Sequence, residues 1–133
     1  MKTGNRPLSP HLWVYLFNGP FLSMTISVSH RFSGMIFGVG TLFLAYWLTS
    51  AAYGPEAFAR AQAFMGSWFG LLLMFCFSMA LFYHMCTGIR HLIWDTGYRL
   101  DKEAVLPSCY MVLAGTVILT GGTWIVALVA GGG

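Results

Sequence analysis

His84 carries the strongest chemical signal in this chain, because it lies in an apolar segment of membrane length. No charged residue occurs in the segment before it, from Phe64 to Tyr83. An ionisable side chain is costly in hydrocarbon, so a histidine there is a candidate functional residue. Imidazole is a common axial ligand of haem iron. The alternative, a core histidine hydrogen-bonded to a neighbouring helix, stays open.

The other histidines limit how His84 could share a haem. His91 follows it by two helical turns, about 10.5 Å along the axis, so the two cannot bind one iron from opposite faces. Gly88 lies one turn after His84. A glycine there leaves room for the edge of a flat macrocycle, which favours the interpretation of His84 as a haem ligand. A second axial histidine must therefore come from another helix, in this chain or in a partner.

His30 and Arg31 form a second candidate site, at the polar end of the first apolar segment. An arginine offers several hydrogen-bond donors to a carboxylate, so this pair is suited to an anion such as a haem propionate. Anchoring at the membrane interface by snorkelling is the alternative for Arg31. His11 lies in a polar arm, and we interpret it as a surface residue.

Ser27 and Arg31 are four residues apart, so on a helix they point to one spot. A hydroxyl beside a guanidinium can stabilise negative charge on a carbonyl oxygen, which quinone reduction requires. Asp95 is a candidate proton donor at the same depth. A helix-start cap for Ser27, and pairing of Asp95 with Arg90 or Arg99, are the alternatives.

The composition identifies the class of protein that positions these side chains. The 133 residues are 57% hydrophobic and only 8% charged, against roughly 25% charged residues in soluble domains. This excludes a water-soluble fold and predicts an integral membrane protein surrounded by lipid, with no nucleic acid partner. The three cysteines show no metal-binding spacing, and we interpret them as small packing residues.

Three apolar runs predict an all-α fold with three transmembrane helices, over residues 27–52, 64–93 and 106–130. Residues 1–26 form a polar arm and membrane-surface segment, and residues 27–133 the transmembrane domain. We expect Pro107 in the first turn of the third helix, where proline is tolerated.

The basic residues predict the orientation in the membrane. Six fall on one side, and Arg60 alone falls on the other. By the positive-inside rule, we expect the N-terminus in the cytoplasm. The six are Lys2, Arg6, Arg31, Arg90, Arg99 and Lys102.

Small and polar residues follow one stripe on each of the first two helices, and GxxxG patterns occur in both. Polar groups facing lipid would be penalised, so we expect both stripes to face the interior of the bundle. The first stripe consists of Ser27, Arg31, Gly34 and Gly38, and the second of Gly66, Gly70, His84, Gly88, His91 and Asp95.

Three motifs in this order resemble the cytochrome b membrane-anchor subunits of succinate dehydrogenase, the respiratory Complex II. They are residues 6–12 (RPLSPHL), 27–34 (SVSHRFSG) and 84–95 (HMCTGIRHLIWD). The resemblance extends over essentially the whole chain. It implies three transmembrane helices that pack with a second small anchor subunit and dock an iron–sulfur subunit and a flavoprotein subunit.

The resemblance also implies roles for residues. His84 is an axial ligand of haem b, with the other axial histidine on the partner anchor, and His30 lies near the haem propionates. Ser27 and Arg31 line the ubiquinone site. Electrons from succinate then reduce ubiquinone. The chain itself performs no succinate chemistry, because it lacks the volume for a flavin domain and the cysteine sets for iron–sulfur clusters.

Two other functions compete with this one. The first is a structural anchor or assembly subunit without a cofactor. The second is a transporter subunit with a proton path through Arg31, His84 and Asp95, which is disfavoured because these residues crowd one half of the membrane. No transit peptide is visible, so we expect a bacterial cytoplasmic membrane rather than the mitochondrial inner membrane.

Overall fold

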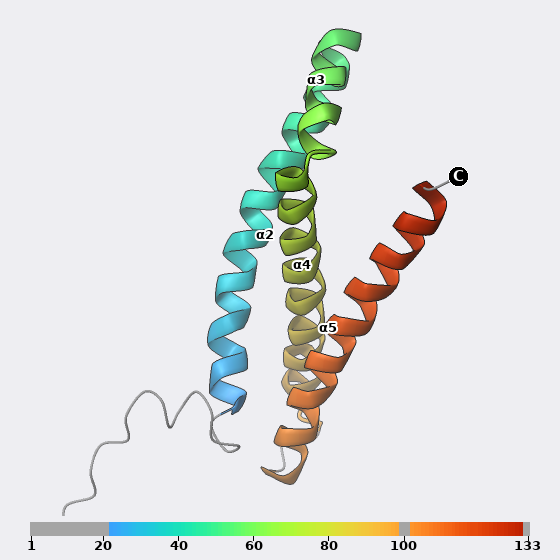
Figure 1. Cartoon of the computed structure of the whole chain (residues 1–133). Helices are drawn as coiled ribbons and strands as arrows, with labels where there is room; N and C mark the ends of the chain where they lie inside the picture. The colour runs from blue at the N-terminus through green and yellow to red at the C-terminus, as the bar shows by residue number, and fades with distance from the viewer. Residues whose placement is uncertain (1–21, 99–101, 132–133) are drawn as a thin grey trace, which may run out of the picture.

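The computed structural model describes residues 22–98 and 102–131, and these form four helices without strands (Figure 1). They are α2 (Leu22–Ala52), α3 (Pro55–Met65), α4 (Trp68–Asp95) and α5 (Lys102–Gly131). Three of them, α2, α4 and most of α5, are long and apolar enough to cross a membrane. The predicted all-α membrane fold with three spans is therefore confirmed.

The helix boundaries differ from the predicted ones. α2 begins five residues earlier than expected, and α5 begins at Lys102 rather than near residue 106. Pro107 consequently lies in the second turn of α5 and not in the first. Ser27 lies in the second turn of α2, so it does not cap the start of the helix, which was the alternative for this residue.

α3 occupies a stretch that was expected to be a short connection. Gly54, with φ 115°, supplies the left-handed turn before it, and Pro55 begins the helix where its missing N–H is harmless. The indole N–H of Trp47 donates a hydrogen bond to the side-chain oxygen of Gln62 at 3.0 Å. Ala61 is fully buried, so α3 is packed back against the membrane helices.

The junction of α3 and α4 interrupts the predicted second helix. The Ser67 hydroxyl accepts a hydrogen bond from the Gly70 N–H at 3.1 Å and caps α4. A Cβ on Gly70 would meet the carbonyl oxygens of Phe64 and Met65. Gly66 and Gly70 therefore make a tight corner between two helices, and the prediction of a helix-packing GxxxG motif there is wrong.

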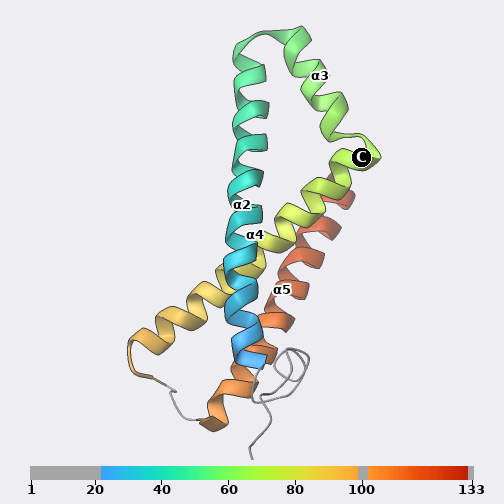
Figure 2. The same cartoon turned by 90° about the vertical axis from the view of Figure 1, so that its left-hand side faces the viewer.

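α4 packs between α2 and α5, and Figure 2 shows it crossing α2 obliquely. The most buried side chains are small or polar, while large apolar ones face outward, as is typical of helices that associate within a membrane. The start of α2, the end of α4 and the start of α5 lie at one end of the bundle, opposite α3 (Figure 1). The candidate residues gather at that end.

Candidate functional site

The site forms where α2 and α4 pack together, and it is built around two imidazoles. The rings of His30 and His84 stack with centroids 4.0 Å apart. His91 meets His30 edge-on at a centroid distance of 5.4 Å. The structure thus brings together three of the four histidines. His11 lies outside the described residues.

His84 is held by hydrogen bonds on one ring nitrogen. Its Nδ1 lies 3.1 Å from the backbone carbonyl oxygen of His30 and 3.2 Å from the Ser33 hydroxyl. A carbonyl oxygen can only accept, so Nδ1 carries the proton and donates it. In the neutral ring this leaves the Nε2 lone pair free, the arrangement common to histidines that bind metals.

The glycine that makes room for the His84 ring is Gly34 on α2. A Cβ on Gly34 would come within 2.9 Å of the His84 Cε1 and 3.3 Å of its Nδ1. Gly88, in contrast, borders His30, whose Cε1 would lie 3.9 Å from an added Cβ. The close approach of α2 to His84 therefore requires a glycine at position 34.

Thr87 orients His30, and sequence reasoning missed it. Its hydroxyl donates to the backbone carbonyl oxygen of Tyr83 and has no second proton. It must therefore accept the hydrogen bond that joins it to the His30 Nδ1 at 2.9 Å. Thr87 is fully buried in an apolar helix. Its position one turn after Tyr83 and beside His84 was the available signal.

The remaining candidate residues face elsewhere. The side of α2 that faces α4 carries Ile26, His30 and Ser33, one residue before the predicted stripe. Ser27 is half-buried and Arg31 is exposed. Gly34 packs on His84, as expected for the stripe. Arg31 and Gly38 are exposed in this chain alone, so their facing the interior of a bundle with a partner subunit stays a prediction.

The second stripe is also only partly interior. His84, Gly88 and His91 are half-buried, but Asp95 is exposed at the end of α4. Gly38, from the first stripe, has no atom of the described residues within 4 Å of an added Cβ. Contacts with this chain alone therefore do not account for Arg31, Gly38 or Asp95.

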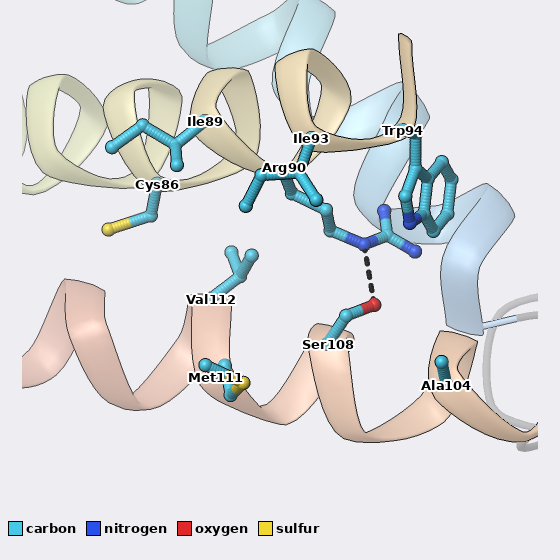
Figure 3. A pocket seen from close by; sticks show the side chains of 9 residues that line it. All are labelled: Cys86, Ile89, Arg90, Ile93, Trp94, Ala104, Ser108, Met111 and Val112. Carbon is cyan, nitrogen blue, oxygen red and sulfur yellow. Dashed lines mark hydrogen bonds between the residues drawn. The ribbon is translucent and has the colours of Figure 1, made fainter. Parts of the chain in front are cut away.

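Arg90 is a second residue whose role the sequence did not reveal. Its side chain is 4% exposed and links three helices. Nε donates to the Ser108 hydroxyl at 2.9 Å, and Nη2 donates to the Ser23 hydroxyl at 2.7 Å. The guanidinium also lies 3.8 Å from the centre of the Trp94 ring (Figure 3). Arg90 therefore makes these contacts and not an ion pair with Asp95, which was one alternative for that residue.

Comparison with known proteins identifies the family of this chain. The family model described as succinate dehydrogenase/fumarate reductase transmembrane subunit matches residues 2–123. The chain belongs to this family. The succinate dehydrogenase cytochrome b556 subunit of Paracoccus denitrificans is 40% identical over 129 residues, which cover 97% of each chain.

More distant relatives span almost as much of this transmembrane subunit. The cytochrome b556 subunit of Rickettsia conorii is 33% identical and covers 90% of this chain and 91% of its own length. The cytochrome b560 subunit of Reclinomonas americana is also 33% identical, over 92% of this chain and 86% of its own. Family membership and the three apolar helices make this chain a membrane anchor of a succinate dehydrogenase complex.

Proposed function

We propose that this chain binds haem b in the membrane and contributes to ubiquinone reduction with electrons from succinate. The observation that carries the haem proposal is the hydrogen bonding of the His84 ring. Its Nδ1 donates to the His30 carbonyl oxygen at 3.1 Å, so its Nε2 lone pair is available to iron. The names of the relatives, cytochrome b556 and b560 subunits, support a b-type haem.

The second axial ligand is assigned to the partner anchor subunit. The rings of His30 and His84 are stacked face to face, with their planes 11° from parallel. Two rings stacked in this way cannot approach one iron from opposite faces. The Arg31 guanidinium is suited to donating hydrogen bonds to the haem propionates, and we propose that His30 lies beside them. Bound haem supplies a one-electron centre within the membrane.

The quinone proposal depends on Ser27, Arg31 and Asp95. Arg31 and Asp95 are exposed and Ser27 is half-buried, so all three are accessible to a ligand or subunit outside this chain. A hydroxyl and a guanidinium on successive turns can donate hydrogen bonds to a quinone carbonyl as negative charge develops on it. Asp95 would supply a proton.

The complex provides the electrons and the remaining ligands. We propose a flavoprotein subunit, an iron–sulfur subunit and a second small anchor as partners, which the succinate dehydrogenase names of the relatives support. The N-terminus is assigned to the cytoplasmic side of a bacterial inner membrane, in line with the excess of basic residues at that end. The soluble subunits dock at the same end.

The decisive experiment is a spectrum of the purified complex carrying His84→Ala. We expect the reduced b-type absorption to be lost while the subunits remain together and oxidise succinate with an artificial dye. His91→Ala is the matched control and keeps the absorption, because His91 is not a ligand. A wild-type complex without haem would show that the chain is a cofactor-free anchor, whereas an unchanged spectrum in His84→Ala would refute His84 as a haem ligand.

A further inference from the structure

Arg90 is a buried cation without a counter-charge in the described part of the chain. Its hydrogen-bond partners, Ser23, Ser108 and Cys109, are neutral, and it stacks on an indole ring. Its Nη1 is buried and has no hydrogen-bond partner among the residues described. An unpaired buried charge is costly, so the charge of Arg90 points to a counter-anion supplied from outside those residues.

A cavity of about 240 Å³ lies beside Arg90, between α4 and α5 (Figure 3). Arg90 and Ser108 provide its polar end. Its other walls are mainly apolar and include Ile89, Met111 and Val112. The cavity therefore combines one charged group with a hydrocarbon-lined space.

The cavity lies near the end of α4 and the start of α5, at one end of the membrane helices. Arg90 lies five residues before the end of α4, about 7.5 Å along its axis. Ile89 and Met111 are 49% and 67% exposed, so the walls continue onto the outer surface of α4 and α5. Cys86 and Val112 line the cavity one turn farther toward the middle of the helices.

We propose that this cavity binds an anionic phospholipid. The phosphate lies at the end of the cavity formed by Arg90 and Ser108, and an acyl chain lies along Ile89 and Met111. Arginine is suited to phosphate because its planar fork of donors matches the phosphate oxygens. A free phosphate would leave the apolar walls unused. The site is separate from the His84 site and does not depend on the haem or quinone proposals.

The test uses the complete complex, delipidated in detergent and offered phosphatidylglycerol or phosphatidylcholine. We expect the wild type to bind phosphatidylglycerol at least tenfold more tightly. Arg90→Gln loses this preference, and Arg90→Lys keeps part of it because the charge remains. Arg60→Gln is the matched control, since Arg60 is exposed on α3 at the opposite end, and it keeps the full preference.

Two further experiments identify the ligand while leaving the charge of Arg90 in place. Ile89→Trp fills the cavity, so it should weaken phosphatidylglycerol binding at least fivefold, and it decides the matter if Arg90→Gln fails to assemble. Millimolar inorganic phosphate should not displace the lipid; displacement would indicate a free-ion site. Asp101 lies outside the described residues. The Asp101→Asn variant is therefore included, to test whether this carboxylate is the counter-charge of Arg90. A preference seen in that variant and absent from the wild type would overturn the proposal, as would unchanged binding in assembled Arg90→Gln.

Discussion

The imidazole ring of His30 lies flat against that of His84, with the ring centroids 4.0 Å apart and the planes 11° from parallel. Each ring is oriented by its own hydrogen bond: His84 donates to the His30 carbonyl oxygen, and His30 donates to Thr87. His30 therefore packs against the His84 ring and supports it. It is not placed to bind the same metal ion from the opposite side. This arrangement makes the contacts around both rings testable.

Gly34→Ala should disturb His84 directly. The added Cβ would come within 2.9 Å of the His84 Cε1, so the ring or α2 must move. We expect the haem content of the purified complex to fall and its stability to drop by about 1–3 kcal/mol, the usual effect of overpacking. Gly38→Ala, one turn later, meets nothing within 4 Å among the described residues and should keep both properties. Equal behaviour of the two variants would contradict the close packing of His84 on α2.

Thr87→Val should leave His30 without its buried acceptor. Valine has nearly the shape of threonine but cannot accept the hydrogen bond from the His30 Nδ1. We expect a loss of about 1–3 kcal/mol in stability, the usual result of leaving a buried donor unsatisfied. The measurement is the thermal unfolding of the purified complex. Thr87→Ser keeps the hydroxyl and should lie closer to the wild type; a Thr87→Val complex as stable as the wild type would refute this role.

Ser27→Ala and Arg31→Ala should separate quinone reduction from succinate oxidation. Removing Arg31 is expected to lower quinone reduction about tenfold or more, since a hydrogen bond to a charged group contributes about 1.5–3 kcal/mol. Ser27→Ala should have a smaller effect. Succinate oxidation by an artificial dye continues in both variants, and Arg60→Ala serves as the basic-residue control. A parallel loss of both activities would point to failed assembly instead.

Gly70→Ala should disrupt the corner between α3 and α4. The new Cβ would meet two backbone carbonyl oxygens and would lie 2.8 Å from the Met65 Cα, and backbone atoms cannot rotate away as a side chain can. We expect a stability loss of about 1–3 kcal/mol, or more if the turn opens. Yield and thermal unfolding in detergent measure it. Gly121→Ala, in open space on α5, should be tolerated, and a tolerant Gly70→Ala would exclude the tight junction.

The sequence predicted the membrane class and the three spans because both depend on bulk hydropathy, which is a property of whole segments. It did not predict α3, since a break such as Gly66-Ser67 is only two residues long within an apolar run. The local signals were present: Gly54-Pro55 begins α3, and Ser67 caps α4. Continuous hydrophobicity outweighed them.

The sequence predicted which residues belong to the candidate site, but not which sides of the helices pack together. His84 was found because a histidine in hydrocarbon is rare, and its neighbour His30 was assigned to the same region. The hydrogen bonds from α2 to α4 come from His30 and Ser33, which lie beside the predicted stripe, while Gly34 of the stripe packs on His84. Arg90 was missed because its partners Ser23 and Ser108 are distant in sequence.

The length of α2 has a consequence for how electrons could enter the membrane. Its 31 residues extend about 46 Å, or about 43 Å across the bilayer at a usual tilt of about 20°, whereas hydrocarbon is about 30 Å thick. The surplus of about 13 Å extends the helix beyond the acyl chains, by about 6 Å at each end when it is shared equally, which brings Ser27 to the hydrocarbon boundary and leaves Arg31 one turn deeper. A water-soluble subunit docked at this surface thus reaches the level of Ser27, one of the residues proposed to bind quinone, without entering the hydrocarbon.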